Sequence, residues 1–324
     1  MASSHVIDRR RAAAKSATAR SRSRLLSMAA VALAVMATVP AWASGYVLGV
    51  LTIAYYFGVF AMGWDLLFGY AGEVNFGPTF LIGLGAYTAG MLNSYADLSP
   101  WLAVIAGAVA AVIGGLMLAV PALRLRGPYF GLVTLVAVLL LQKLIVVFAG
   151  VTGGEIGLTV PSVLAVDAGV NYYYALVFLA VSGVVLTALA RSPMGLILQA
   201  TGQDPIEAQA LGFNVTKHKL VAFTVSAFFS GLAGALFVFY LGTVSVGSVV
   251  DLSIDVQIII AAVLGGRRTI VGAVLGAVFL IAAAEYLRPI GELSNFVVAA
   301  AALAALMFFP DGFLGWLLHP KEPP

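Results

Sequence analysis

Long apolar runs, most of them close to twenty residues, alternate along the chain with short stretches rich in glycine, proline or charged residues. A helix that crosses the lipid core needs about twenty mostly apolar residues, so this pattern predicts a series of membrane-spanning helices. One run, 254–266, is shorter, which is typical of a half-helix or of one part of a broken pair. The ten predicted spans are 25–43, 46–68, 77–94, 100–122, 129–149, 172–190, 219–242, 254–266, 269–288 and 293–310.

The composition excludes a soluble protein. Of the 324 residues, 62% are hydrophobic and 10% are charged, against about 45–50% and about 25% in soluble domains. We therefore expect an all-α integral membrane protein, a polytopic helical bundle of about ten transmembrane segments. One transmembrane domain would cover 25–312, between a basic cytoplasmic tail, 1–24, and a second cytoplasmic tail, 313–324.

The basic residues near the N-terminus predict the orientation. Seven of the seventeen lysines and arginines precede the first span. Such clusters stay in the cytoplasm and do not indicate nucleic-acid binding here, so both termini should be cytoplasmic if the number of spans is even. The alternative is a signal peptide cleaved near Ala41-Trp42-Ala43, but the basic region is too long for one and the apolar run is nearer bilayer length, which favours a retained span.

The largest polar interruption between spans is the loop 191–218, which carries apolar residues at helical spacing and is too charged to cross lipid. It predicts short amphipathic helices on the cytoplasmic face. Asp204 is placed to cap a helix that Pro205 opens and Gly212 closes. This small helix would either protrude towards a protein partner or lie on the membrane surface.

A second polar interruption falls between the spans 46–68 and 77–94. It predicts a broken helix, because its glycines allow close backbone approach and its polar side chains offer hydrogen bonds to a zwitterionic solute. An ordinary tight turn is the alternative. The candidate pathway residues of this segment are Gly69, Tyr70, Gly72, Glu73, Asn75 and Gly77.

Ionisable residues inside spans are candidates for function, because burying a charge in lipid is costly. Lys143 is the deepest basic one, and it could line a polar pathway, extend its ammonium group to the membrane surface or pair with Glu285. Asp65 and Glu285 lie close to the ends of their spans, where a structural role is expected, and Asp255 completes the set. A weak internal repeat also relates 67–72 to 263–266, as in transporters built from two related halves.

No catalytic, metal or cofactor site is expected. The chain has no cysteine and only three scattered histidines, which excludes thiolate metal sites and cysteine nucleophiles. It also lacks the glycine-rich phosphate-binding loop followed by lysine that many ATPases use, so any ATP-driven work would be done by a partner.

Several blocks together resemble the inner-membrane permease subunits of branched-chain amino-acid ABC transporters, in the LivM-like branch, from about Tyr55 to Gly312. The blocks are GYAGEVNFGPTFLIGLGAYTAG (69–90), RLRGPYFGLVTL (124–135), TGGEIGL (152–158), the segment 191–236 and VLGGRRTIVGAVLGA (263–277). The resemblance implies uptake by alternating access in the bacterial inner membrane. It also implies three kinds of partner: a second homologous permease subunit, two cytoplasmic ATP-binding subunits and a periplasmic substrate-binding protein.

The resemblance further implies that 191–218 is the coupling loop that docks on the ATPase. The residues on that block are Asp204, Glu207, Ala208, Ala210, Leu211 and Gly212. The chain departs from the sequence usual in this family at Glu73-Val74-Asn75, at Pro78-Thr79 and at Arg267-Arg268. These differences leave urea, short amides or other small acids as alternative solutes. An ion-coupled secondary transporter is the alternative from another class, but it should carry more acidic groups deep in its spans.

Overall fold

The computed structural model describes residues 31–124, 129–291 and 300, which belong to two compact units, Met1–Leu48 and Gly49–Pro324. In the first unit, a short apolar helix covers Val31–Ala41. Its last turn is the 3-10 helix η1, Val39–Ala41, with a proline in its first turn. Both predicted tails, the predicted span 293–310 apart from residue 300, and the start of 25–43 lie outside the described residues.

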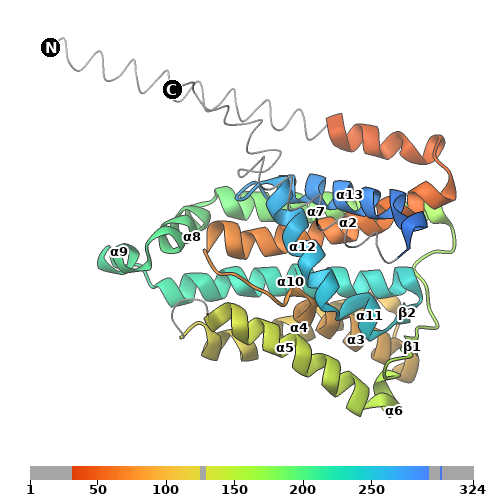
Figure 1. Ribbon diagram of the computed structural model, residues 1–324, viewed down its shortest axis with the longest axis horizontal. Helices are drawn as coiled ribbons and strands as arrows, with labels where there is room; N and C mark the ends of the chain where they lie inside the picture. Colours follow the sequence, from red (N-terminus) through yellow and green to blue (C-terminus); the bar gives the residue numbers. More distant parts are fainter. Residues whose placement is uncertain (1–30, 125–128, 292–299, 301–324) are drawn as a thin grey trace, which may run out of the picture. The chain divides into compact units, whose positions relative to one another are not determined.

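The second unit is almost entirely helical (Figure 1). Its helices are α2 (Gly45–Asp65, which begins in the first unit), the π-helix η2 (Leu66–Tyr70), α3 (Pro78–Ala96), α4 (Pro100–Ala122), α5 (Tyr129–Val147), α6 (Ala149–Thr152), α7 (Ala168–Arg191), α8 (Pro193–Gln203), α9 (Pro205–Ala210), α10 (Val215–Leu241), α11 (Val246–Val249), α12 (Leu252–Gly265), α13 (Val271–Tyr286) and the 3-10 turn η3 (Arg288–Ile290). Two short strands, β1 (Leu158–Thr159) and β2 (Thr243–Val244), pair antiparallel, with Leu158 opposite Val244.

The apolar pattern locates the helices closely, and the largely helical structure agrees with the predicted all-α membrane protein. Within the described residues, six helical segments are long and apolar enough to cross a membrane: Gly45–Tyr70, Pro100–Ala122, Tyr129–Val147, Ala168–Arg191, Val215–Leu241 and Val246–Gly265. The short eighth predicted span corresponds to α12, which follows the four-residue α11 after a break at Val250 and Asp251. Together they make up the candidate span Val246–Gly265. The count of ten is not confirmed, since α3 is less apolar and Val271–Tyr286 is shorter than a full span.

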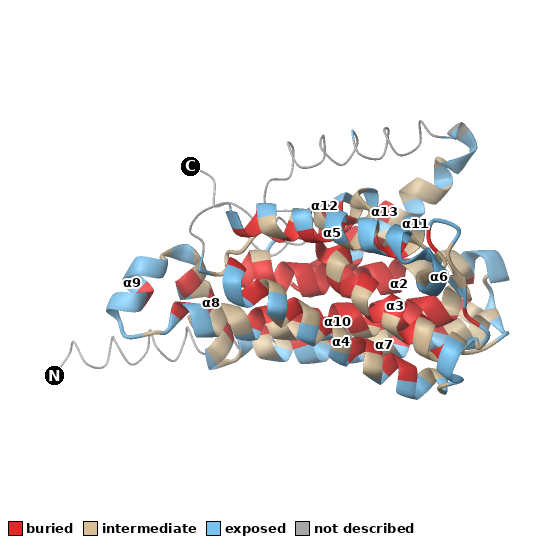
Figure 2. Cartoon of the chain, turned by 90° about the horizontal axis from the view of Figure 1, so that it is seen from below, coloured by how far each residue is buried: buried red, intermediate tan, exposed pale blue. Residues whose placement is uncertain are grey.

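The core of the second unit lies around α2 and α10. In the most apolar part of each of these two candidate spans, 72% is buried, whereas the corresponding share in the other four candidate spans is 33–39%. Figure 2 shows this buried layer in red. Helices α3, α4 and α10 pack on one another through glycines. A Cβ atom on Gly85 would overlap the Gly231 backbone, and one on Gly107 would lie 2.5 Å from the Gly85 carbonyl oxygen. Such contacts let helix backbones approach closely in a membrane.

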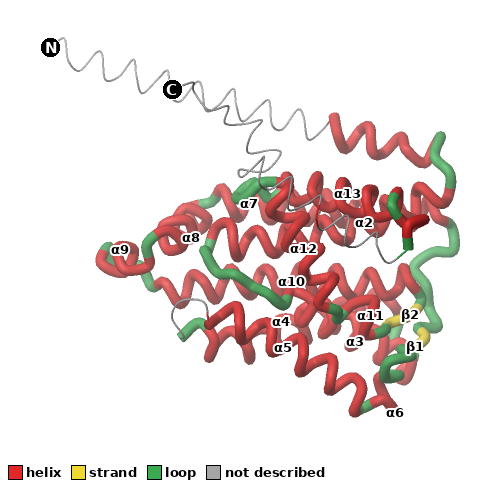
Figure 3. The backbone as a smooth tube through the Cα atoms, in the orientation of Figure 1, coloured by secondary structure: helices red, strands yellow, loops and turns green. Residues whose placement is uncertain are grey.

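The two ends of the bundle differ. Helices α8 and α9 lie at one end, and the β1–β2 pair lies at the other (Figures 1 and 3). Helices α12 and α13 form a closely packed hairpin, in which a Cβ atom on Gly276 would overlap the Ala261 carbonyl group. The segment between η2 and α3 starts at the α8–α9 end and runs into the bundle (Figure 3).

Candidate functional site

Helix α9 forms where the sequence predicts it and is capped as predicted. Asp204 Oδ1 accepts hydrogen bonds from the backbone N–H groups of Ile206 and Glu207, at 2.8 and 3.0 Å, and Pro205 occupies the first turn. At the other end Gly212 has a φ of +89°, a left-handed conformation that glycine adopts without steric cost. The six-residue helix is therefore defined by its own local sequence.

The outer surface of α9 is apolar as well as polar. Ile206 and the C-cap residue Leu211 are 79% and 75% exposed. Glu207 and Ala210 are exposed too, whereas Ala208 is 2% exposed and packs against its own chain. Of the residues predicted to couple to an ATPase, Ala208 is therefore on the face of the helix that packs against the chain, and the others are at least partly accessible.

The segment that follows α2 is a broken helix rather than a tight turn. The helix widens into the π-helix η2, and residues 71–77 are then non-helical until α3 begins at Pro78. Gly72 has a φ of +71°. Single π-turns inside helices are rare and occur often at functional sites.

The polar groups of this break are bonded within the chain. Asn75 Oδ1 accepts a hydrogen bond from the Gly77 N–H at 2.9 Å, and the Asn75 carbonyl oxygen accepts one from Trp64 Nε1 at 2.6 Å. The Phe76 N–H donates to Thr134 Oγ1 on α5 at 3.0 Å. A Cβ atom on Gly77 would overlap the Thr134 carbonyl group. Phe76 and Gly77 therefore hold the break against α5, while Asn75 bonds to Gly77 and to Trp64 on α2. These bonds use groups that a solute would otherwise bind.

Gly69 and Tyr70 meet the turn that connects α12 to α13. The Tyr70 hydroxyl donates to the Arg268 carbonyl oxygen at 2.7 Å, and Arg268 Nε donates to the Gly69 carbonyl oxygen at 2.8 Å. The guanidinium of Arg267 lies over the Phe68 ring, 4.5 Å from its centroid. Burial lowers the pKa of this guanidinium, Arg268 lowers it further and Asp65 opposes the shift; the group still remains charged near neutral pH.

Two buried aspartates cap helices from opposite halves of the chain. Asp65, at the end of α2, accepts hydrogen bonds from the N–H groups of Arg268 (3.0 Å) and Ile270 (2.9 Å), just before α13. Asp255, on α12, accepts them from the N–H (2.7 Å) and the hydroxyl (2.8 Å) of Thr79, at the start of α3. Each half thus supplies a carboxylate to a helix start of the other.

Gly72 joins the break to the end of α8, and Glu73 joins it to the first turns of α10. Glu73 Oε1 and Lys219 Nζ form an ion pair at 2.6 Å, with the two side chains 18% and 11% exposed. A Cβ atom on Gly72 would lie 2.7 Å from the Gly202 carbonyl oxygen at the end of α8. No side chain larger than hydrogen fits at this contact, so the two backbones touch.

Lys143 stands apart from these contacts. It is exposed on α5 and makes no ion pair with any residue in the described part of the chain. Its predicted partner Glu285 instead pairs with Arg288 at 2.9 Å. A role for Lys143 in a pathway stays a prediction.

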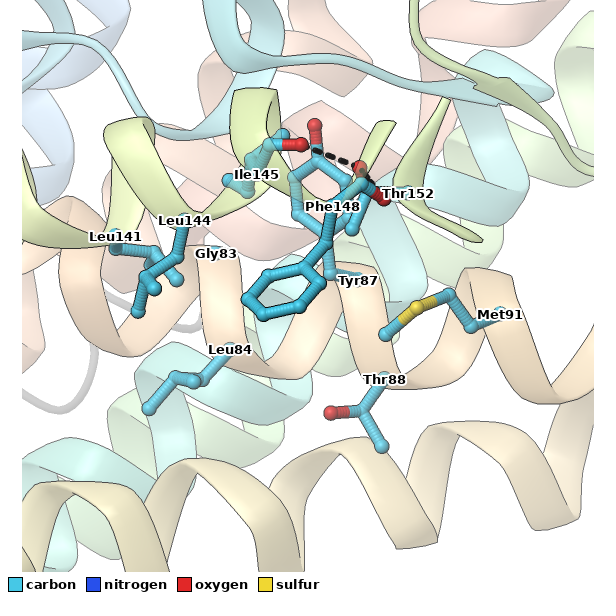
Figure 4. A pocket seen from close by; sticks show the side chains of 10 residues that line it. All are labelled: Gly83, Leu84, Tyr87, Thr88, Met91, Leu141, Leu144, Ile145, Phe148 and Thr152. Carbon is cyan, nitrogen blue, oxygen red and sulfur yellow. Dashed lines mark hydrogen bonds between the residues drawn. The ribbon is translucent and has the colours of Figure 1, made fainter. Parts of the chain in front are cut away.

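An apolar cavity of about 140 Å³ lies between α3 and the α5–α6 segment (Figure 4). Phe148, Met91 and Leu144 are among the side chains that line it. The Thr152 hydroxyl beside it donates to the Ile145 carbonyl oxygen at 2.6 Å. A lining of this kind suits a hydrocarbon chain and offers nothing to the charges of a zwitterion, so we do not place a solute there.

Several structural residues give little signal in the sequence. Asp65 and Asp255 stand out as acids within apolar runs, but Lys219 and Thr134 have no feature that indicates their partners. Gln142 is another case: its side-chain amide donates to the Val250 carbonyl oxygen at 2.6 Å, where the break between α11 and α12 leaves that oxygen without a helical donor.

Comparison with known proteins gives a consistent result. Residues 46–309 match the family described as branched-chain amino acid transport system / permease component. The high-affinity branched-chain amino acid transport system permease protein LivM of Escherichia coli (strain K12) is 28% identical over 314 residues, which cover 88% of this chain and 74% of that protein. The LivM protein of Salmonella typhimurium is 28% identical over 285 residues, 79% of this chain and 67% of that protein.

Other relatives act on different solutes. The guanosine ABC transporter permease protein NupQ of Bacillus subtilis is 26% identical over 282 residues, which cover 78% of this chain and 86% of that protein. No solved structure matches the chain. The comparisons therefore agree on a permease and differ on what it carries.

Proposed function

Because this chain belongs to the permease component family of branched-chain amino acid transport systems, we propose that it is one transmembrane subunit of an ATP-driven importer for branched-chain or related amino acids. It works in the bacterial inner membrane with a second, homologous permease subunit. A periplasmic binding protein delivers the solute, and two cytoplasmic ATP-binding subunits drive alternating access. The chain itself is a transport component and not an enzyme.

Helix α9 is the observation that carries this proposal. It is short, capped at both ends and exposes Ile206 and Leu211 beside the acidic Glu207. An exposed apolar pair on a protruding helix matches the way that amphipathic helices insert into grooves of partner proteins. The ATP-binding subunits supply the groove, with Asp204 and Gly212 fixing the helix that enters it.

The test is retention of the ATP-binding subunits. The tagged chain is purified in mild detergent from cells that make all the subunits, either unchanged or as the double variant Ile206→Asp/Leu211→Asp. We expect the variant to lose the ATP-binding subunits at least tenfold, since about 1.4 kcal/mol of lost binding free energy already gives that factor, and to keep the second permease subunit.

The matched control is Ile156→Asp. Ile156 is 97% exposed but lies in the loop between α6 and β1, away from the α8–α9 end (Figure 1), so this variant should retain the ATP-binding subunits fully. Equal retention in all three preparations would remove the docking role of α9. A chain that runs alone and supports solute flux driven by an ion gradient would instead establish a secondary transporter.

Solute identity is tested separately. LivM relatives favour branched-chain amino acids, and the NupQ relative makes guanosine the second candidate. Uptake of labelled leucine into vesicles holding the whole assembly, in competition with unlabelled guanosine, distinguishes them. We expect unlabelled isoleucine and valine to compete with leucine and guanosine to have no effect.

A further inference from the structure

One short piece of chain, residues 69–79, which we call the link segment, contacts the chain on both sides of α9. Before α9, the end of α8 touches the link segment through Gly202 and Gly72, where neither backbone leaves room for a Cβ atom. After the loop, Lys219 in the first turns of α10 pairs with Glu73 at 2.6 Å. A displacement of α9 can therefore act on this segment, beside the direct contacts of α8 with α7 and of α8 and α9 with α10.

The Glu73–Lys219 pair is more than a surface ion pair. Its side chains are only 18% and 11% exposed, and the short contact is a charge-assisted hydrogen bond. Exposed pairs contribute little because water screens them, whereas charge-assisted bonds shielded from water are among the stronger polar contacts in proteins.

The link segment reaches deep into the bundle at its other end. There the N–H and hydroxyl of Thr79 bond to Asp255 on α12, at 2.7 and 2.8 Å. On the way, Phe76 is bonded to Thr134 on α5, and Tyr70 is bonded to the turn before α13 through Arg268. The segment thus contacts α5, α12 and the α12–α13 turn as well as the α8–α9 loop.

We propose that the link segment transmits movement of the α8–α9 loop to α12 and the α12–α13 turn, with Glu73 and Lys219 as the positioning residues that fasten it to α10. This inference rests on the proposed function, because it takes the ATP-binding subunits as the source of the movement. Without the Glu73–Lys219 pair, the loop still docks and ATP is still hydrolysed, but less solute is moved for each ATP consumed.

A purely structural role for the pair predicts something else. Loss of the pair would then lower the amount of folded complex, and ATP hydrolysis and uptake would fall in the same proportion. The ratio of leucine taken up to ATP hydrolysed separates the two roles, because it does not depend on how much folded complex is present.

The chain contains no cysteine, so the pair can be replaced by a reversible link. The double variant Glu73→Cys/Lys219→Cys is assembled with all its partners in vesicles and assayed with labelled leucine, first as free thiols, then joined by a short bifunctional thiol reagent, then reduced. We expect the uptake-to-hydrolysis ratio to be at least fivefold below the parent with free thiols, to recover towards the parent value when joined and to fall again on reduction.

Two controls complete the experiment. The parent complex receives the same reagents, which accounts for cysteines of the partner subunits. Glu285→Gln removes the ion pair with Arg288, whose side chain is 72% exposed, and should leave the ratio unchanged. If the parent complex hydrolyses ATP and takes up leucine, but the double variant has the same uptake-to-hydrolysis ratio with free thiols, when joined and after reduction, the inference is overturned and the proposed function stands. A parent that does neither would overturn the proposed function and the inference with it.

Discussion

Replacing Asp65 by leucine should destabilise the bundle more than any other single change discussed for this chain. Asp65 is 1% exposed and accepts the N–H groups of Arg268 and Ile270. Leucine leaves the buried Ile270 N–H and the part-buried Arg268 N–H without this acceptor, at up to about 3 kcal/mol each, or roughly 2–6 kcal/mol in all. Arg268 and Ile270 also have φ values of +64° and +51°, a backbone strain that persists only where the surroundings hold it. Thermal unfolding of the purified chain in mild detergent measures the loss.

The control for this prediction is the same substitution at an aspartate that caps its own helix. Asp167 accepts the N–H of Val170 at 2.9 Å on an exposed turn, and losing such a cap costs about 1 kcal/mol. Asp65→Asn should fall between the two leucine variants, because the amide retains one accepting oxygen. Similar midpoints for Asp65→Leu and Asp167→Leu would show that the α12–α13 turn does not depend on the carboxylate.

The second large effect is expected at Gly85, where α3 crosses α10. A Cβ atom there would lie 2.7 Å from the Gly231 carbonyl carbon and would overlap its oxygen, whereas carbon atoms in contact are normally about 3.5–4.0 Å apart. Backbone atoms cannot move aside as a flexible side chain can, so α3 and α10 must separate. We expect Gly85→Ala to lower the free energy of unfolding by about 1–3 kcal/mol, seen as a lower midpoint of thermal unfolding.

Gly183 provides the matched control because it is also a glycine within a helix. The nearest atom to its added Cβ would be Met62 Sδ at 3.7 Å, an ordinary contact. Gly183→Ala should therefore be neutral, or more stable by up to about 1 kcal/mol through helix propensity. If Gly85→Ala behaved like Gly183→Ala, the close crossing of α3 and α10 would not be essential to the fold.

The sequence predicts those parts of the structure that local patterns determine. The span 100–122 coincides with α4, and Asp204, Pro205 and Gly212 predict α9, because apolar runs and helix caps act within one or two turns of chain. The broken helix after α2 could be anticipated from its glycines. The sequence indicates the break before α12 only in general terms, because a short apolar run is typical of a half-helix as well as of a broken pair.

Contacts between distant segments could not be predicted in this way. The Glu73–Lys219 pair joins residues 146 apart, and neither side chain carries a local sign of its partner. Lys143 illustrates the converse, because a lysine within an apolar run indicates an unusual environment without saying which one. The place of Asp65 near a span end predicts a structural role. It does not indicate the two backbone N–H groups that Asp65 binds, which only the structure shows.

The reciprocal aspartate caps have a consequence for synthesis of the chain. The N–H of Ile270, which Asp65 binds, is synthesised 205 residues after Asp65. Asp255, which binds Thr79 at the start of α3, is synthesised 176 residues after Thr79. At about 5–20 residues per second, the ribosome needs roughly 10–40 s to supply the missing partners. During that interval the first helices enter the bilayer with a carboxylate and a helix start that lipid cannot satisfy. The emergence of α12 and α13 therefore sets the moment at which the earlier helices become committed to their final place in the membrane.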